Sequence, residues 1–398
     1  MPSSSENILF FISCFGVLQG IVLSAFIYFH PKSDRSVNIF LASYIGSSAI
    51  IMAIPLMSLI IPWQKTFFME AITFLPGPMI YLYVRSLKET ITWLKTFPHL
   101  LIFIIYFFFC YWWFDYMGRK YPNEKFFPVE NLYSPITISV LVTRYSQMLF
   151  YYFLARKKFK VYQQSIRHLF SEISRIELNW IKWLITGYLF IIIVTVIIIG
   201  LMVAFPQYFY HLFLLNIALV TPYIYATTYM GITQPTIWQK KTDENKQQLE
   251  KEMQEVEHFE SEIVIVEKSR GTKTTLQPNK IDDIVNNIVN VIEKQKLYTE
   301  TELTLKQLAD KLQLPSYQVS QAINDGMKKN FYDLINGYRV ENAKRLLLDP
   351  KNENYTILSV GFEAGFNSKT TFNTVFKKFT GVTPTEFRNK NKEITALA

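Results

Sequence analysis

The chain has 398 residues, of which 50% are hydrophobic, 16% are aromatic and only 18% are charged. Soluble domains have about 25% charged residues, so this composition argues against a wholly soluble protein. The two cysteines, Cys14 and Cys110, are too few for a disulfide framework, and the chain lacks the ligand spacing of a metal site. No metal and no cofactor are therefore expected.

The formal net charge of +9 is unevenly distributed along the chain. Residues 1–239 carry 17 basic and 9 acidic side chains, a net charge of +8, whereas residues 240–277 have a net charge of −2. Residues 278–398 carry 17 basic and 14 acidic side chains, a net charge of +3. Because most of the excess lies in the apolar half, the overall basicity is no evidence of nucleic-acid binding by itself.

The N-terminal half has the apolar segments of a membrane domain, which we predict over residues 1–234. A helix rises about 1.5 Å per residue, so about 20 apolar residues cross the hydrocarbon core of a bilayer. The start "MPSSSEN" has no basic residue and the first apolar run is too long for a signal peptide. Seven segments are predicted to span the membrane: Ile8–Phe29, Val37–Ile61, Phe67–Leu87, Phe97–Met117, Pro135–Leu154, Trp183–Phe205 and Phe209–Ile232.

The loops between these segments predict the orientation of the domain. Positively charged residues are enriched in cytoplasmic loops. With the N-terminus outside, the inner loops carry 12 Lys and Arg residues and the outer segments carry 4. An odd number of spans then places the C-terminus in the cytoplasm.

Polar residues at membrane depth are candidates for function. Arg144 lies in the middle of the fifth segment, and Glu70 opens the third. They are predicted either to bind a ligand or to form a structural pair inside the bundle, with Glu70 at headgroup level as a further alternative. Pro76-Gly77-Pro78 predicts a break or kink in the third segment. No pair of residues resembles a nucleophile and its base, so an enzyme is not expected.

Residues 235–280 are predicted to form a juxtamembrane helix and linker. Leu249, Met253, Val256 and Ile263 fall at helical intervals. Residues 249–263 are therefore predicted to be either a short coiled coil that joins two protomers or a solvated helix with one apolar edge. The following "EKSRGTKTTLQPNK" predicts a flexible joint.

Residues 281–398 are predicted to form short amphipathic helices that contain two helix-turn-helix units. In the first unit, the segment "TLKQLADKLQLPSYQVSQAIND" predicts a helix, a break at residues 313–315 and a second helix with Ser316 as its N-cap. Val319, Ala322 and Ile323 are expected to point inward. The outward face is expected to hold Tyr317, Gln318, Ser320, Gln321 and Asn324.

The pattern recurs after a long predicted helix, Phe331–Leu348. "TILSVGFEAGF" is expected to close on Gly365, and Asn367-Ser368 is expected to cap "KTTFNTVFKKF". The core stripe of that last helix is expected to hold Phe372, Val375, Phe376 and Phe379. Its outward face, which has no acidic residue, is expected to hold Lys369, Thr370, Thr371, Asn373, Thr374, Lys377 and Lys378. A surface of this kind suits phosphates and base edges.

The spacing of the two units predicts how they would bind. The connecting helix of 18 residues is about 27 Å long. With its turns, it can place the two recognition helices about 34 Å apart, one turn of B-DNA. A single chain could then contact two adjacent segments of the major groove.

Residues from about Val291 to Arg388 resemble the AraC/XylS-type transcription regulators. The matching stretches are "LTLKQLADKL", "YRVENAKRLL" and "GFEAGFNSKTTFNTVFKKFTGVTPTEFR". The apolar half is similar in layout to the bacterial members with an N-terminal multi-span region. The resemblance implies double-stranded DNA as a partner, with RNA polymerase as a further candidate, and a bacterial inner-membrane protein that senses a small-molecule or envelope signal.

By position, the resemblance places DNA contacts on the outward faces of both recognition helices. The first recognition helix departs from the family pattern, because it has no Arg or Lys between Ser316 and Asp325. We therefore predict an all-α protein in which a seven-helix transmembrane bundle precedes a cytoplasmic AraC-type domain. The alternative is a membrane receptor or transporter whose C-terminal module binds protein. The expected DNA contacts are Tyr317, Gln318, Ser320, Gln321, Asn324, Lys369, Thr370, Asn373, Thr374 and Lys377.

Overall fold

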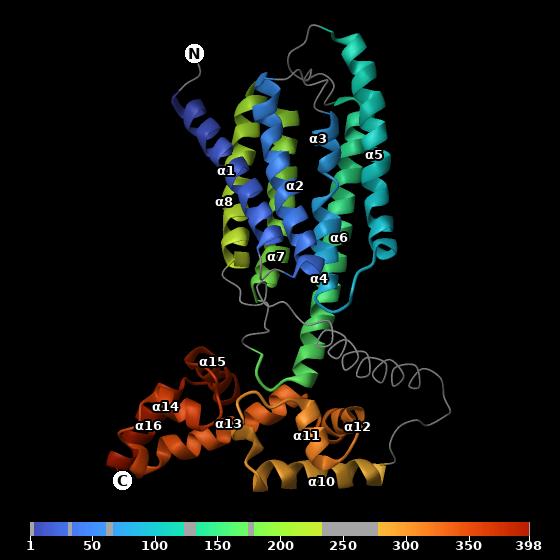
Figure 1. Ribbon diagram of the computed structural model, residues 1–398. Helices are drawn as coiled ribbons and strands as arrows, with labels where there is room; N and C mark the ends of the chain where they lie inside the picture. Colours follow the sequence, from blue (N-terminus) through green and yellow to red (C-terminus); the bar gives the residue numbers. More distant parts are fainter. Residues whose placement is uncertain are drawn as a thin grey trace. The chain divides into compact units, whose positions relative to one another are not determined.

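A computed structural model describes residues 4–30, 34–60, 67–122, 133–173, 179–232 and 278–397. These residues form helices and no strand, apart from one isolated antiparallel bridge between Phe170 and Thr304. The all-α prediction is therefore confirmed for the described part of the chain. The chain divides into two compact units, residues 1–160 with 178–242 and residues 161–177 with 243–398 (Figure 1).

The first unit contains helices at all seven predicted positions. The third predicted segment is divided into two short helices, because Pro76 opens a new helix at a position where its missing N–H costs nothing. This confirms the predicted break. The helices are α1 (Ser4–Phe29), α2 (Arg35–Ile60), α3 (Phe67–Ile72), α4 (Pro76–Ser86), α5 (Trp93–Lys120), α6 (Pro135–Leu169), α7 (Asn179–Ala204) and α8 (Phe209–Ile232), with the 3₁₀ turn η3 (Pro206–Tyr208) before α8.

Among the described residues, four helical stretches are long and apolar enough to cross a membrane. The seven-span prediction is therefore supported only in part. The break shortens α4 to 11 residues, and the second half of α6 is basic. The four stretches are Arg35–Ile54, Trp93–Lys120, Trp180–Ala204 and His211–Gly231.

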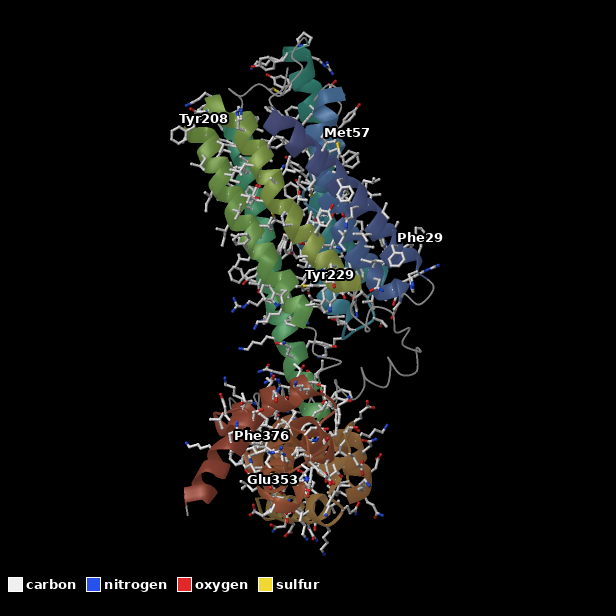
Figure 2. All side chains as sticks on the ribbon, turned by 90° about the vertical axis from the view of Figure 1, so that its left-hand side faces the viewer. Phe29, Met57, Tyr208, Tyr229, Glu353 and Phe376 are labelled. Atoms are coloured by element: carbon white, nitrogen blue, oxygen red, sulfur yellow. The ribbon has the colours of Figure 1, made fainter. Side chains whose placement is uncertain are left out.

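The outer surface of α5 is apolar over most of its length, and its exposed charged residues lie near the two ends of the helix. Its exposed large side chains recur every three or four residues, which places them on one face of the helix. Soluble proteins rarely expose so long an apolar surface. Figure 2 shows Tyr208 and Tyr229 near the two ends of α8, and both are exposed, as aromatic residues at membrane interfaces are. The exposed side chains of α5 include Leu94, Phe97, Leu101, Ile105, Phe108, Trp112 and Tyr116.

Small residues allow α1 and α2 to approach each other closely. A Cβ atom on Gly20 would lie 2.6 Å from Ala49 Cβ, and one on Gly46 would lie 2.9 Å from Ser24 Oγ. Ser24 Oγ donates a hydrogen bond to the carbonyl of Ala42, 2.7 Å away on α2. Helices in a membrane pack through such small residues, because the backbones can then come into van der Waals contact.

The second unit contains two groups of short helices and a long helix, α13, that runs between them (Figure 1). Phe331, Ile335, Phe366, Phe372 and Phe376 are buried in its core. The first group is α10 (Pro278–Lys294), the 3₁₀ turn η5 (Leu297–Thr299), α11 (Leu305–Leu312), α12 (Ser316–Gln321) and the π-helical turn η6 (Ala322–Gly326). The long helix and the second group are α13 (Phe331–Leu348), η7 (Pro350–Asn352), α14 (Ile357–Glu363), α15 (Lys369–Thr380) and α16 (Pro384–Leu397).

The compact units differ from a simple division along the chain. Residues 161–177 belong to the C-terminal unit, although they lie between two predicted spans. The predicted boundaries at 1–234, 235–280 and 281–398 stay predictions. Most of the predicted linker, including the coiled-coil pattern at 249–263, lies outside the described residues.

Candidate nucleic-acid interface

The first helix-turn-helix unit consists of α11, a tight turn and α12. A capping box starts α11, since Gln307 N donates to Thr304 Oγ1 over 3.2 Å and Thr304 N donates to Gln307 Oε1 over 2.8 Å. Gln313 ends α11 in the left-handed conformation, with φ of 54°. The prediction that Ser316 caps α12 is wrong, because Pro315 holds the N-cap position without a side-chain hydrogen bond and Ser316 is already helical.

Burial in α12 corrects part of the predicted DNA-binding face. Tyr317, Gln318 and Asn324 are half-buried, but Ser320 is only 7% exposed and Gln321 only 2%. The segment formed by α12 and η6 packs against more than one helix, because α11 contacts α12 and α10 contacts both α12 and η6. The outward orientation predicted for Ser320 and Gln321 is therefore wrong.

Two lysines that the sequence-based prediction missed follow the first recognition helix. Lys328 and Lys329 are both exposed, and Lys328 adopts a left-handed backbone conformation with φ of 53°. They supply positive charge next to a recognition helix that has none between residues 316 and 325. Their signal was the basic pair directly after the amphipathic segment.

The second recognition helix, α15, begins at the predicted cap Ser368. Thr371 N donates to Ser368 Oγ over 3.1 Å, and Gly381 ends the helix with φ of 82°. The predicted contacts Lys369, Thr370, Thr374 and Lys377 are exposed, and Asn373 is half-buried. Their spacing of one, four, five and eight residues from Lys369 places all five on one face of the helix.

Two predicted orientations on α15 are wrong. Thr371 was expected to face outward, but it is buried and its hydroxyl accepts a hydrogen bond from Ser368 Oγ at 2.9 Å. Phe379 was expected in the core, yet it is 38% exposed. Near the end of the helix, Lys378 Nζ forms an ion pair with Asp333 Oδ1 of α13 at 2.6 Å. Helical periodicity alone does not predict these two orientations, because it takes no account of the cap of α15 or of the contact between α15 and α13.

The junction between the two groups of helices is organised by the fully buried Arg339 of α13. Its guanidinium donates to three backbone carbonyls in the segment before α11: Tyr298 at 2.8 Å, Glu300 at 2.8 Å and Thr301 at 3.1 Å. It also lies 5.9 Å from the ring of Phe366, which precedes α15. Burial lowers the pKa of Arg339 to about 10, so the side chain stays charged near neutral pH. Sequence analysis did not identify this residue.

In the first compact unit, the structure brings Glu70 and Arg144 together. Arg144 Nη2 donates to Glu70 Oε2 over 2.9 Å, which fits the predicted structural pair. Gln147 Nε2 donates over 3.0 Å to the carbonyl of Phe74, at the break between α3 and α4. Arg144 Nε and Gln147 Oε1 are buried and have no hydrogen-bond partner in the described part of the chain. The described residues also contain no group of three or more His, Cys, Asp or Glu side chains that could hold a metal ion.

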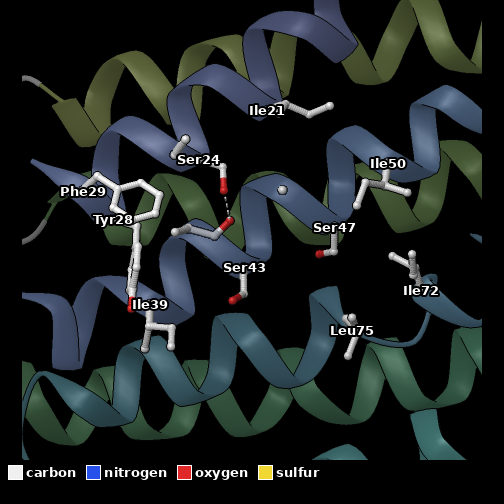
Figure 3. Close-up of a pocket in the computed structure, with 13 residues that line it drawn as sticks. Ile21, Ser24, Tyr28, Phe29, Ile39, Ser43, Ser47, Ile50, Ile72 and Leu75 are labelled. Carbon is white, nitrogen blue, oxygen red and sulfur yellow. Dashed lines mark hydrogen bonds between the residues drawn. The ribbon is translucent and has the colours of Figure 1, made fainter.

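A separate pocket of about 590 Å³ is lined by α1, α2 and the region of the α3–α4 break (Figure 3). Its wall is almost entirely apolar, and the hydroxyls of Ser24 and Ser47 are already bonded to the carbonyls of Ala42 and Tyr44. Glu70 and Arg144 do not line it. The hydroxyl groups of Tyr28 and Ser43 are the other polar side-chain groups of the lining, so the pocket is mainly apolar and differs from the predicted ligand site.

Comparison with known proteins agrees with this geometry. Residues 308–390 match a helix-turn-helix domain family. Uncharacterized HTH-type transcriptional regulators of Staphylococcus aureus strains COL and MSSA476 are each 30% identical to the chain over 114 residues. That match covers 29% of this chain and 14% of each relative, so it spans only about a seventh of the relatives' length. No solved structure matches.

The matched region begins in α11 and runs through both recognition helices into α16. The C-terminal unit thus contains a helix-turn-helix domain of the AraC type. The match to the family model does not extend to the helices of the first compact unit.

Proposed function

We propose that the chain is a membrane-anchored, sequence-specific DNA-binding transcription regulator that responds to a signal at its membrane domain. One observation carries the DNA-binding part of this proposal. The helix-turn-helix domain presents an exposed face of α15 that holds two lysines, two threonines and an asparagine and no acidic residue. Lysines at such a face neutralise phosphates, and short polar side chains bond to base edges.

The length of α13 supports binding to two adjacent segments of the major groove. The helix has 18 residues and is therefore about 27 Å long. Successive major-groove segments on one face of B-DNA lie about 34 Å apart. In this proposal α15 supplies most of the affinity. The first helix-turn-helix unit contributes to DNA binding through Tyr317, Gln318 and Asn324. Lys328 and Lys329 contact the phosphates.

The apolar surface of the first unit supports membrane anchoring. Helices occupy all seven predicted positions, and four stretches are long and apolar enough to cross a bilayer. Together with the basic residues in alternate loops, this favours a multi-pass protein of the bacterial inner membrane with an external N-terminus and a cytoplasmic DNA-binding domain. Contact with RNA polymerase and a homodimer through residues 249–263, which lie outside the described residues, complete the proposal.

A polar small molecule or envelope signal would bind near Glu70 and Arg144. The two buried polar atoms without a partner, Arg144 Nε and Gln147 Oε1, support this assignment, because buried polar groups are normally hydrogen-bonded. Such a ligand changes DNA binding only if it binds two states of the protein with unequal affinity. The proposed role requires no enzymatic activity.

The DNA-binding proposal is tested by replacing Lys369 and Lys377, the two lysines among the predicted contacts on α15. With the full-length protein in nanodiscs, Lys369→Ala and Lys377→Ala should each lower DNA affinity. Each should also reduce the slope of log K against log salt by about one, because one phosphate contact is lost.

Lys294→Ala is the matched control, since Lys294 is an exposed lysine of α10 outside both helix-turn-helix units. It should leave the affinity and the salt slope unchanged. The target sites are those found by genome-wide mapping of DNA bound by the full-length protein. The alternative in which the module binds protein would be favoured by equal effects of all three substitutions. It would also be favoured if random DNA bound as tightly as the mapped targets.

A further inference from the structure

A short piece of the membrane half of the sequence forms part of the DNA-binding unit. Residues 161–173, here called the docking segment, comprise the end of α6 and the four residues after it, and they belong to the second compact unit. A loop between two membrane helices would ordinarily be solvated. In the docking segment, seven side chains are instead buried: Tyr162, Ser165, Ile166, Leu169, Ser171, Glu172 and Ile173.

The docking segment pairs with the backbone just before α11. Phe170 and Thr304 form the antiparallel bridge, and Ser171 N donates to the carbonyl of Leu303 over 3.2 Å. Ser171 Oγ donates to the same carbonyl over 2.7 Å. The first helix-turn-helix unit is therefore fastened to the segment at the residue that caps its first helix.

Ser171 also completes the hydrogen bonds of the buried Arg339. Arg339 Nη1 donates to the carbonyl oxygen of Ser171 over 3.1 Å, and Nη2 donates to Ser171 Oγ over 3.1 Å. Asn336 Nδ2 donates to the same carbonyl over 3.0 Å. Without Ser171, the remaining acceptor for Nη1 is Asn336 Oδ1 at 3.4 Å. Ser171 has no exposed surface, so the segment fills this position completely.

A second contact links the docking segment to the C-terminal part of the second recognition helix, α15. The guanidinium of Arg167 lies 5.8 Å from the ring centre of Tyr332, and Lys378 Nζ of α15 lies 5.9 Å from the same ring. Tyr332 is next to Asp333, the ion-pair partner of Lys378. The docking segment therefore contacts α13 close to the point where α13 holds α15.

We propose that the docking segment is the element through which the membrane unit controls DNA binding, by holding the junction at Arg339 in the arrangement that binds DNA. This inference rests on the proposed function. Because α6 is one continuous helix from Pro135 to Leu169, a shift of its membrane part pulls directly on Ser171.

Withdrawal of the segment changes the placement of both recognition helices. A buried guanidinium with unpaired N–H groups is strongly unfavourable. Arg339 must therefore move or admit water when Ser171 leaves. The same guanidinium holds the carbonyls of Tyr298, Glu300 and Thr301 before α11 and lies against Phe366 before α15. The docked state binds DNA tightly, and the undocked state binds weakly.

Docking is tested first, without reference to DNA, by a disulfide trap in the full-length protein in its native membrane. The hydrogen bond from Ser171 N to Leu303 O flanks the Phe170–Thr304 pair, as in a non-hydrogen-bonded antiparallel pair. Such pairs have Cα atoms about 4.5 Å apart, within the range that a disulfide spans. In a Cys14→Ser, Cys110→Ala background, oxidised Phe170→Cys/Thr304→Cys should resist maleimide labelling and regain it after reduction.

The control pair is Phe170→Cys/Lys351→Cys, in which the second cysteine is exposed beyond the far end of α13. It should stay fully labelled. If the Phe170→Cys/Thr304→Cys protein labels as readily as this control, the segment does not dock and the inference is overturned.

The coupling is then tested by DNA binding of the same full-length proteins in nanodiscs. The oxidised trap should bind the mapped target within about twofold of the parent. Ile173→Asp, which places a charge in the buried segment, should weaken binding at least tenfold, and Ser171→Ala should weaken it about threefold. Oxidation of the trap in the Ile173→Asp background should restore most of the affinity, which a merely misfolded variant would not show.

Loss of binding in the oxidised trap, or unchanged binding in Ile173→Asp, overturns the coupling while leaving DNA binding by the parent intact. If the trap protects its two cysteines but the parent protein binds no specific DNA, the proposed function and the coupling are overturned together. The labelling result then still records docking, so the two failures can be told apart.

Discussion

The two helix-turn-helix units of this protein have the same order of helices but differ in how they present their recognition helices. The second helix, α15, is capped by a serine side chain, ends at a left-handed glycine and exposes two lysines on its outer face. The first, α12, has no side-chain cap, continues into a π-helical turn and has Ser320 and Gln321 buried. A helix covered on more sides offers fewer groups to DNA, so we expect unequal contributions from the two units.

The largest expected difference concerns the cores under the two recognition helices. Phe372 is fully buried, with ring centres 5.0 Å from Phe366 and 5.6 Å from Phe376. Phe372→Ala should lower the free energy of unfolding of the second helix-turn-helix unit by about 3–5 kcal/mol. Val319→Ala, at the buried centre of α12, should cost about 2 kcal/mol.

Hydrogen exchange of the full-length protein measures both core substitutions, from the amides of α15 and of α12. An equal loss of stability at the two sites would contradict this expectation. It would mean that the first helix-turn-helix unit depends on its small core as strongly as the second helix-turn-helix unit depends on its aromatic core.

DNA specificity should separate the two units next. Asn373→Ala should lower the affinity for the target site by about 1–3 kcal/mol and relax selection at one base pair. Gln321→Leu should leave affinity unchanged and raise the free energy of unfolding by up to about 1 kcal/mol, because the buried Nε2 and Oε1 have no partner in the described part of the chain.

Selection of binding sites from a random DNA library compares these two variants. Altered base preference in Gln321→Leu would show that α12 exposes this residue when DNA binds.

The capping serines provide a smaller and closely matched contrast. Ser368→Ala removes the acceptor for Thr371 N and should destabilise α15 by about 1 kcal/mol. Ser316→Ala should change stability by a few tenths of a kcal/mol at most, because Ser316 does not occupy the N-cap position. Local hydrogen exchange in the first turn of each helix gives the two values. A comparable loss at Ser316 would contradict the assignment of Pro315 as the N-cap.

The smallest expected effect is a pH dependence of stability that is present in the second helix-turn-helix unit and absent from the first. Thr383 N donates to Glu386 Oε2 over 2.7 Å, and this hydrogen bond lowers the pKa of Glu386. A lowered pKa in the folded state means that the stabilisation is present above the ordinary glutamate pKa and is lost as pH falls through the folded value. The corresponding box at Thr304 and Gln307 is uncharged and should not respond. Amide exchange at the start of α16 and α11 between pH 6 and pH 3, after correction for intrinsic rates, tests this difference.

The helices themselves were well predicted from the sequence because their signals are local. Apolar runs marked all seven helical positions of the first unit, and Pro76 marked the break in the third. In the second compact unit, the predicted Phe331–Leu348 helix agrees with α13, and the predicted cap Ser368 begins α15. These local signals do not decide which apolar helices cross a membrane, and only four stretches of the described chain meet the length and hydropathy requirements.

The outward orientation of the candidate contact residues was predicted well on α15 and poorly on α12. Helical periodicity assumes one buried face, and α15 largely follows it. On α12 the packing of α10 adds a second buried face, which the spacing of apolar residues in α12 itself does not encode. The same limit explains Thr371, because its hydroxyl is held in the cap of its own helix.

The sequence by itself determined the helical class, the apolar and polar halves, the two helix-turn-helix units and the acid-free face of α15. These features depend on composition, periodicity and capping, which act over a few residues. Only the tertiary structure decided that Arg144 pairs with Glu70 and that Arg339 joins segments 38 to 41 residues away. It alone brought Ser171 to Arg339, 168 residues along the chain. Contacts between distant residues arise from packing and desolvation of the whole unit, and no local pattern specifies them.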